Sequence, residues 1–454
     1  MIRINSSNIY ALLLIESQNK GYSEYLCQVW KFISQKRSFR VSTYLLHIKQ
    51  TKQFINQLHI MMLERYRLSV LIIVLAIFSS CDIINPGNKD SSIKTNTVQS
   101  EKAVGIAGKD MLRTDDGVLL LGNATKDYEK PDQMYLAELD QQGNILWEQI
   151  YDDGRFRNPE AMIKTSDGNI LVTGLGWSNN TLDGNLYVGK LSPRGTVLWE
   201  DTYRFKYDDS GFGGNTGLSA VEVEDGYIIG GKGVSSAGGS GTTTSMVTKV
   251  DYEGQLQWSE SISEYEVEWI HNLLYDPESG DLFAALNYAN DEDIFRINSA
   301  VEINNKESSK GIAYLGDVTF GDMIKNESGS YIAVGQENST FFQVAFDREG
   351  KQIWSNYLNE FEYQSATKII EPTNSSFYTL GTVRDSTDNT DIYIVNSFAD
   401  GSINWKQRFG KDDHWEQPVD LVSFGGGNLG VITNYQHDGF YDIKFWQIPQ
   451  SATQ

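Results

Sequence analysis

The sequence is poor in cysteine, proline and basic residues. It contains two cysteines and eight prolines among 454 residues, and 38 Lys and Arg against 60 Asp and Glu. Since the cysteines are Cys27 and Cys81, a domain downstream of Cys81 has no pair from which to form a disulfide. The formal net charge of −22 argues against a DNA- or RNA-binding surface, which needs a basic footprint. The sequence also lacks a CxxC motif, a P-loop and a nucleophile–base motif.

Glycine and aromatic residues, in contrast, are abundant. There are 41 glycines, and aromatic residues occupy 12% of positions. Helix-rich chains seldom combine so much glycine with so many aromatic residues, so this composition argues against an all-α fold. With 40% hydrophobic and 22% charged residues the chain can bury a sizeable core, so wholesale disorder is excluded. The length suits two or three domains, or one large closed all-β fold.

The first eighty residues differ in composition from the rest. They carry ten Lys and Arg against three Asp and Glu, a net charge of +7, which leaves −29 for the remainder. Gly21 is their only glycine. Such a change marks a processing or domain boundary. We expect residues 1–60 to be an over-extended gene model or a cytoplasmic segment, with the true start at Met61 or Met62.

A short basic stretch and an apolar run precede Cys81. The run, residues 68–80, is shorter than the roughly 20 residues of a transmembrane helix and suits a secretory signal. Ser79 and Ser80 before Cys81 resemble the bacterial lipobox, which implies acylation of Cys81 and anchoring in a bilayer. We therefore predict a signal peptide at 61–80 and a flexible tether at 81–101. The alternative is a signal-anchor helix with Cys81 unmodified.

A turn followed by an apolar strand recurs about every 52 residues from Gly117 to Gly427. Glycine at the turn allows a positive φ, and the apolar run predicts a strand buried on both faces. The seven copies begin at Asp115, Ser166, Glu224, Glu278, Glu327, Asn374 and Gly426.

A second repeat, D-x-x-G-x-x-x-W, lies out of phase with the first. The tryptophan at a fixed phase predicts a packing residue between neighbouring sheets rather than a ligand contact. The copies end at Trp147, Trp199, Trp258 and Trp354, with a close copy ending at Trp405.

Two hairpins per period predict an all-β fold, a seven-bladed β-propeller of four-stranded antiparallel blades over residues 102–450. The seventh unit lacks its fourth strand, so we expect the amino-terminal segment Lys102–Ile106 to close the ring. The repeat resembles that of quinoprotein (PQQ-type) propellers, and the whole arrangement is similar to exported bacterial propeller lipoproteins.

The loops before the first strand and between the second and third strands should emerge on one face. Their aromatic and acidic residues suit carbohydrate or peptide binding, although acidic loops also simply keep a secreted protein soluble. Asp385, Asp388 and Asp391 do not have the spacing of a calcium loop, so we expect no metal, and likewise no cofactor and no catalytic residue. The candidate ligand-binding residues are Trp177, Trp269, His271, His414, Trp415, Tyr435 and His437.

The sequence thus predicts a lipid-anchored β-propeller of the bacterial cell envelope. Its expected role is a binding or scaffold module for a glycan or an envelope protein, without nucleic acid. One alternative is a carbohydrate-active hydrolase or lyase that uses loop carboxylates, for which a close pair of carboxyl groups with perturbed pKa values would be the sign. The other alternative, a quinone-dependent dehydrogenase, is implied by the repeat resemblance alone.

Overall fold

The computed structural model divides the chain into Met1–Lys89 and a compact unit, Asp90–Gln454. Cys81, the predicted signal peptide and residues 1–60 lie outside the residues that the structure describes. Within the described part, no helix is long and apolar enough to cross a membrane. The described residues are 93–127, 132–177, 184–204, 214–235, 242–260, 268–288, 292–298, 309–314, 318–373, 376–384, 390–410, 415–437 and 440–449.

Strand pairing groups the described strands into seven four-stranded antiparallel sheets, which we call blades 1 to 7 in chain order. Blade 1 contains β2 (Gly105–Arg113), β3 (Gly117–Thr125), β4 (Gln133–Asp140) and β5 (Ile145–Ile150). Blade 2 contains β6 (Phe156–Lys164), β7 (Ile170–Trp177), β8 (Asn185–Leu191) and β9 (Val197–Tyr203). Blade 3 contains β10 (Asn215–Val223), β11 (Gly226–Ser235), β12 (Thr242–Val250) and β13 (Leu256–Glu260). Blade 4 contains β14 (Glu268–Asp276), β15 (Asp281–Tyr288), β16 (Glu292–Asn298) and β17 (Ser309–Tyr314).

The remaining three blades follow the same plan. Blade 5 contains β18 (Val318–Lys325), β19 (Tyr331–Glu337), β20 (Thr340–Phe346) and β21 (Gln352–Leu358). Blade 6 contains β22 (Tyr363–Thr373), β23 (Ser376–Arg384), β24 (Thr390–Phe398) and β25 (Ile403–Phe409). Blade 7 contains β26 (Glu416–Gly425), β27 (Asn428–His437), β28 (Phe440–Ile448) and, from the other end of the chain, β1 (Lys94–Val98).

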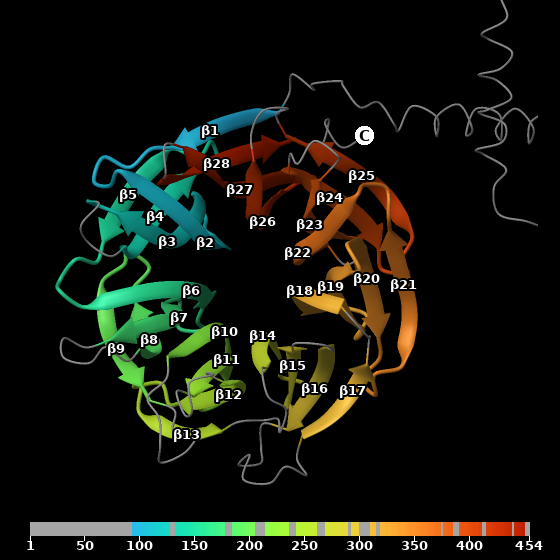
Figure 1. Cartoon of the computed structure of the whole chain (residues 1–454), viewed down its shortest axis with the longest axis horizontal. Coiled ribbons are helices and arrows are strands. Elements are labelled where there is room, and N and C mark those ends of the chain that lie inside the picture. Colours follow the sequence, from blue (N-terminus) through green and yellow to red (C-terminus); the bar gives the residue numbers. More distant parts are fainter. Residues whose placement is uncertain are drawn as a thin grey trace, which may run out of the picture. The chain divides into compact units, whose positions relative to one another are not determined.

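The blades form a ring around their first strands. The first strand of each blade contacts the first strand of the next, and β26 contacts β2 to complete the circuit. Figure 1 shows these strands nearest the centre and the fourth strands at the rim. The predicted all-β propeller of four-stranded blades is therefore confirmed.

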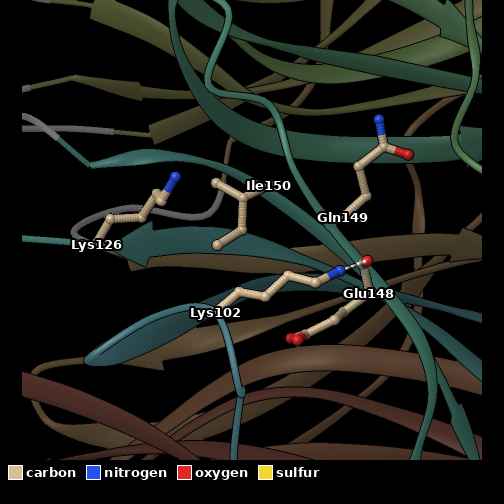
Figure 2. A pocket seen from close by; sticks show the side chains of 5 residues that line it. All are labelled: Lys102, Lys126, Glu148, Gln149 and Ile150. Carbon is tan, nitrogen blue, oxygen red and sulfur yellow. Dashed lines mark hydrogen bonds between the residues drawn. The ribbon is translucent and has the colours of Figure 1, made fainter.

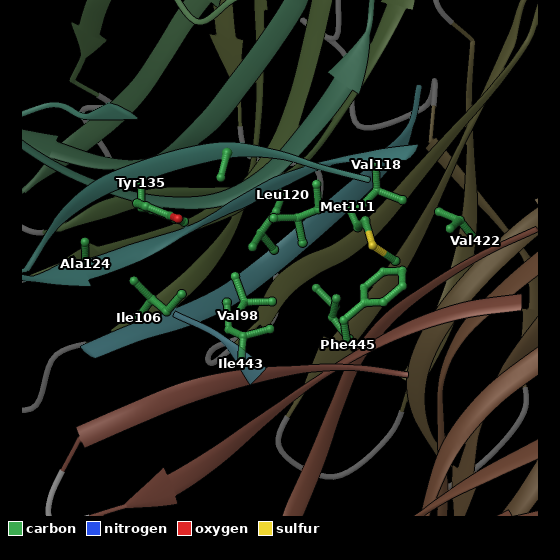
Figure 3. Packing of buried hydrophobic residues seen from close by; sticks show 13 residues of the cluster. Val98, Ile106, Met111, Val118, Leu120, Ala124, Tyr135, Val422, Ile443 and Phe445 are labelled. Atoms are coloured by element: carbon green, nitrogen blue, oxygen red, sulfur yellow. The ribbon is translucent and has the colours of Figure 1, made fainter. Parts of the chain in front are cut away.

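The prediction that Lys102–Ile106 completes the last blade was wrong. Residues 94–98, assigned to the tether, form β1 and pair with β28, whereas Gly105 and Ile106 already belong to β2. The reason is burial: Val98 is 1% exposed and packs with Ile106 and Ile443 in the core between blades 7 and 1 (Figure 3). A strand with one buried apolar residue gives little periodic signal in a sequence.

D-x-x-G turns pack against the tryptophan of the preceding blade. In the turn at Asp251 the carboxylate Oδ1 accepts the N–H groups of Glu253 and Gln255, and Gly254 has φ +82°. A Cβ on Gly254 would lie 2.7 Å from the ring of Trp199 in the preceding blade, whose indole N–H donates to the Tyr252 carbonyl at 3.0 Å.

Blades 5 and 6 repeat this arrangement. A Cβ on Gly401 would lie 2.5 Å from the Trp354 ring, and the Trp354 indole N–H donates to the Ala399 carbonyl at 3.1 Å. The predicted packing role between sheets is thus confirmed for Trp199 and Trp354.

Every first strand contains a β-bulge at an equivalent position, where its register with the second strand shifts by one residue. In five blades the second strand places a glycine against the bulge, because a Cβ there would meet a first-strand carbonyl oxygen. At Gly381 that distance would be 2.2 Å, to the oxygen of Ser365. The same contact would be 2.3 Å at Gly122, 2.2 Å at Gly174, 1.9 Å at Gly231 and 2.0 Å at Gly335.

The bulge glycines provide a test of the repeat. We expect Gly381→Ala to lower the free energy of unfolding in urea by about 2 kcal/mol, because its methyl group overlaps backbone that cannot move without breaking the ladder. Gly214→Ala is the matched control, since a Cβ there would meet nothing within 4 Å. Equal stability of the two variants would contradict the close approach.

Candidate functional site

The bulges place one residue per blade in a belt close to the ring axis. In each first strand the register skips one residue, and the next residue starts the following ladder segment. A bulge re-aims side chains, and polar ones predominate here. We call this set the inner belt: Asp110, Ala161, Ser219, Asn272, Asp322, Lys368 and Asp420.

Belt side chains accept hydrogen bonds from the first strand of the next blade. Oδ2 of Asp420 accepts the N–H of Met111 at 2.9 Å, and Oδ2 of Asp110 accepts the N–H of Met162 at 2.7 Å. The amide in each case directly follows the next belt residue, so the bond passes from blade to blade. Two further bonds have the same geometry: Leu273 to Ser219 at 3.0 Å and Ile369 to Asp322 at 3.1 Å.

Lys368 brings the acidic members of the belt together. Its Nζ lies 3.9 Å from Oδ1 of Asp110, 3.9 Å from Oδ2 of Asp322 and 4.0 Å from Oδ1 of Asp420. These carboxylates come from blades 1, 5 and 7, so the ammonium group of blade 6 is shared among three other blades. Asp110 and Asp420 are also close to each other, because both accept the N–H of Met111.

Burial and mutual charge perturb the acids of the belt. Burial raises the pKa of Asp420 well above its usual value; Lys368 opposes this shift and Asp110 adds to it. Burial also raises the pKa of Asp322, again against the effect of Lys368. The nearby carboxylates, Asp420 first, raise the pKa of Lys368, so that side chain stays charged.

The chemistry open to the belt is limited by its own hydrogen bonds. The oxygens of Asp110, Asp322 and Asp420 accept backbone amides, so the carboxylates are held in place by the fold they stabilise. Among the described residues no group of three or more His, Cys, Asp and Glu side chains is placed to hold a metal ion. Of the three aspartates tested for calcium spacing, Asp391 forms an ion pair with Arg408, and the other two lie outside the described residues.

The loop face is the second candidate region, and the register defines it. The start of each first strand pairs with the end of the second, as in Phe156 with Trp177 and Glu416 with Tyr435. The loops at these strand ends therefore emerge together, on what we call the loop face. Trp177 stacks on Phe156, with centroids 3.6 Å apart and planes inclined by 13°, so one of its faces is already occupied. Trp269 lies at the start of β14 and is half-buried.

Trp415 and Tyr435 lie on the loop face in blade 7. Trp415 directly precedes β26 and is 46% exposed. Tyr435 is half-buried, and the ammonium group of Lys444 lies 4.2 Å from its ring centroid. Lys444 also pairs with the buried carboxylate of Glu416 at 3.3 Å. Tyr435 is thus held by the sheet, whereas Trp415 is presented to solvent.

Of the three candidate histidines, the structure describes the side chain of His271 alone. His271 is the skipped residue of the β14 bulge, beside the belt rather than in a loop. Burial lowers its pKa, and its Nδ1 has no partner among the described residues. His414 lies outside the described residues, as does the side chain of His437.

The sequence analysis missed two exposed apolar residues and the inner belt. Tyr441, at the start of β28, is 40% exposed, and Val104, just before β2, is 51% exposed. The inner belt was also missed, although it has a signal: Asp110, Asp322 and Asp420 each lie seven residues before the turn position of their repeat, at Gly117, Gly329 and Gly427.

An open hollow of about 610 Å³ lies at the rim of blade 1, lined by Ile150 and its neighbours. Figure 2 shows Lys102 donating from its Nζ to the carbonyl of Glu148, at 2.7 Å. Lys126 forms an ion pair with Asp152 at 2.8 Å, so both lysines of the hollow have partners. The hollow is lined by Lys102, Lys126, Glu148, Gln149 and Ile150.

Neither a protein-family model nor a curated protein matches the sequence. Solved propeller structures do match. YCF48 bound to a D1 peptide aligns at TM-score 0.45 and 8% identity, over 80% of this chain and 97% of YCF48. The propeller domain of the Trilobed protease from Pyrococcus furiosus aligns at 0.44 and 8%, over 77% and 96%. A puromycin hydrolase variant aligns at 0.44 and 10%, over 78% of this chain, which spans about half (53%) of that protein. The likeness concerns the fold alone.

The charge balance of the belt provides a test. We expect Lys368→Met to lower the free energy of unfolding by about 2–3 kcal/mol at pH 8, because it leaves buried carboxylates without their cation. The variant raises the pKa values of Asp322 and Asp420 further, because Lys368 lowers both in the wild type. A folded-state pKa above the unfolded value makes stability fall as pH rises, so the loss should be smaller at pH 5.5 than at pH 8.

Lys109→Met is the matched control, since Lys109 is also at a bulge but pairs with Glu160 alone, at 2.8 Å and partly exposed. Its effect should be at most about 1 kcal/mol and nearly independent of pH. The free energy of unfolding is measured by urea denaturation. If Lys368→Met lowers it equally at both pH values, the loss comes from packing and not from charge.

Proposed function

We propose that the chain is a lipid-anchored binding module of the bacterial cell envelope, which takes an extended glycan or protein segment on its loop face. The observation that carries this proposal is the exposure of apolar residues where blades 7 and 1 meet. We call these residues the seam track: Trp415, Tyr441 and Val104, which are 46%, 40% and 51% exposed.

The three residues of the seam track lie in or next to strands of blades 7 and 1. Trp415 directly precedes β26, Tyr441 is in β28 and Val104 directly precedes β2. A Cβ on Gly105, the residue after Val104, would lie 3.0 Å from the Tyr441 carbonyl oxygen. Exposed apolar residues at the ends of rigid strands favour a contact surface.

A binding role is favoured over a hydrolase or lyase. Asp110 and Asp420 form a close carboxyl pair with a perturbed pKa, which was the expected sign of an enzyme. However, the two carboxylates share the N–H of Met111 as a donor. Asp110 also accepts the N–H of Met162, and Asp420 also accepts the N–H of Leu421. Groups fixed in this way support the ring.

The predicted anchor is compatible with a free loop face. β1 begins at Lys94, opposite Gln447 near the end of β28, and ends at Val98, opposite Ile443. Since β28 starts on the loop face, β1 begins on the opposite face of the propeller.

Lipidation is tested by mass spectrometry of the mature amino terminus. We expect the chain to begin at Cys81 and to carry acyl groups, and Cys81→Ala to release the protein from membranes. An unprocessed terminus at Met1, or an unmodified Cys81, would contradict the anchor but not the binding site.

Binding is tested with glycan and peptide arrays probed with the full chain in detergent micelles. We expect Trp415→Ala to weaken binding at least about tenfold, because a contact ring supplies much of the affinity at such a site. Phe398→Ala is the matched control, since Phe398 is 40% exposed but ends a third strand on the opposite face. A ligand bound equally by wild type and both variants would place the site elsewhere.

A further inference from the structure

The face opposite the loop face carries exposed apolar residues around its circumference. Asp140 at the end of β4 pairs with Gly117 at the start of β3, so the turns between third and fourth strands lie on this face. Among the described residues, the exposed Leu, Ile and Phe side chains all lie at these turns, in the first two residues of a fourth strand or, in one case, at the end of a third. They are between 40% and 53% exposed. We call this set the apolar rim: Leu146, Leu198, Leu256, Ile353 and Phe398.

A bulge in the fourth strand exposes three members of the apolar rim. In blades 1, 2 and 5 the register between the third and fourth strands skips one residue of the fourth. The skipped residue is Leu146, Leu198 or Ile353. Because a bulge re-aims the side chain away from the ladder, it here presents an apolar group to solvent at an equivalent position of three blades.

Blades 3 and 6 have polar residues, Gln257 and Asn404, at the skipped position. Each of them still exposes an apolar side chain at the same turn. In blade 3 it is Leu256, directly before Gln257, and in blade 6 it is Phe398, at the first position of the turn, where the D-x-x-G repeat has an aspartate. Five blades thus expose an apolar residue at this level from three different positions of the repeat, which favours a contact surface over a by-product of the fold.

The distribution of the apolar rim selects a flat and wide partner. Figure 1 shows the fourth strands β5, β9, β13, β21 and β25 at the periphery of the ring, so the five side chains are spread over five of the seven blades. A peptide or an oligosaccharide reaches neighbouring blades, whereas a surface as wide as the ring contacts all five at once. A lipid bilayer is such a surface, and apolar side chains bind it by entering the boundary between headgroups and acyl chains.

Charge and the start of the ring favour a bilayer over a second copy of the chain. Asp140, Asp251 and Asp347 lie in the same turns, and the chain after residue 80 has a formal net charge of −29, so two copies joined at this face would bring like charges together. On a bilayer these carboxylates remain in the hydrated headgroup layer. β1 begins on this face at Lys94, and thirteen positions separate Lys94 from Cys81, which span at most about 45 Å when extended. An acylated Cys81 would therefore keep this face close to the membrane.

We propose that the apolar rim rests on the surface of a phospholipid bilayer and directs the loop face away from it. The five side chains enter the headgroup layer and hold the ring in one orientation. Five half-exposed residues bind weakly by themselves, and the contact acts at the high local concentration that a covalent anchor supplies. This inference rests on the proposed lipid anchor and goes beyond it by naming the protein surface that contacts the membrane.

The test measures lipid contact at single positions of the full chain in vesicles of zwitterionic phospholipid. The photoreactive amino acid p-benzoyl-phenylalanine replaces Leu198 in one variant and Tyr357 in the other. Tyr357 is the matched position, since it is 49% exposed but lies near the end of a fourth strand, on the loop face. After irradiation, phospholipid adducts are quantified by mass spectrometry. We expect at least about ten times more adduct at position 198, and a yield that is unchanged in about 0.5 M KCl because the contact is apolar.

A second experiment tests whether the apolar rim acts as one surface. The photoreactive amino acid replaces Phe398, and Leu146→Ser, Leu198→Ser and Ile353→Ser are introduced together in the same chain. We expect the lipid adduct to fall at least about fivefold, because the ring loses its orientation on the bilayer. Tyr357→Ser in place of the three substitutions should leave the adduct unchanged. Thermal melting of each variant shows that the ring is intact.

Three results would overturn the inference. Equal lipid adducts at positions 198 and 357, or none at either in a chain with an acylated Cys81, would exclude the rim contact while the anchor stands. Covalent dimers in place of lipid adducts would show that this face joins two copies. Loss of the adducts in KCl would make the contact electrostatic. Lipid adducts at position 198 in a chain with an unmodified Cys81 would instead support the rim contact and contradict the anchor.

Discussion

The structure depends on one repeated interaction, a hydrogen bond from a backbone amide of one blade to a bulge-positioned side chain of the preceding blade. A bulge interrupts the ladder and leaves an amide near the ring axis without a strand partner. Asp110, Ser219, Asp322 and Asp420 accept such amides from the next blade. Because a buried amide without an acceptor is costly, these four bonds fix the two blades at each of their junctions relative to one another. The Asp420 bond to Met111 is the one that joins the last blade to the first.

The same arrangement concentrates negative charge, and Lys368 offsets it. Three carboxylates at about 4 Å from one ammonium group would repel one another strongly in a poorly hydrated site without that cation. Burial is the main cause of the raised pKa of Asp420, and the charge of Asp110 adds to it. In many sites a shifted carboxyl pair indicates catalysis. Here burial at the ring axis explains the raised pKa, and the backbone amides that bond to Asp420 hold it as part of the ring.

Much of the fold was readable from the sequence because its signals are repeated. Glycine at turns and tryptophan at a fixed phase predicted the hairpins, the four-stranded blades and the role of Trp199. The closing strand was misplaced because Lys94–Val98 is short, polar and unlike the strand it replaces. The loop-face position of Trp415 could be predicted from strand order, but its exposure could not, since that depends on which side chains neighbouring loops cover. Tyr441 was missed for the same reason: it reads as an ordinary strand residue.

The meeting point of blades 7 and 1 differs from the other junctions in a way that favours a binding site. Blade 7 is assembled from both ends of the chain, so no D-x-x-G turn connects its third strand to its fourth. Its residues are thus freer to depart from the repeat. A tryptophan and a tyrosine that remain nearly half exposed contribute less burial to folding than the rings that pack between the other blades. Both rings lie beside the junction that the Asp420 bond holds, and the proposed binding role depends on them.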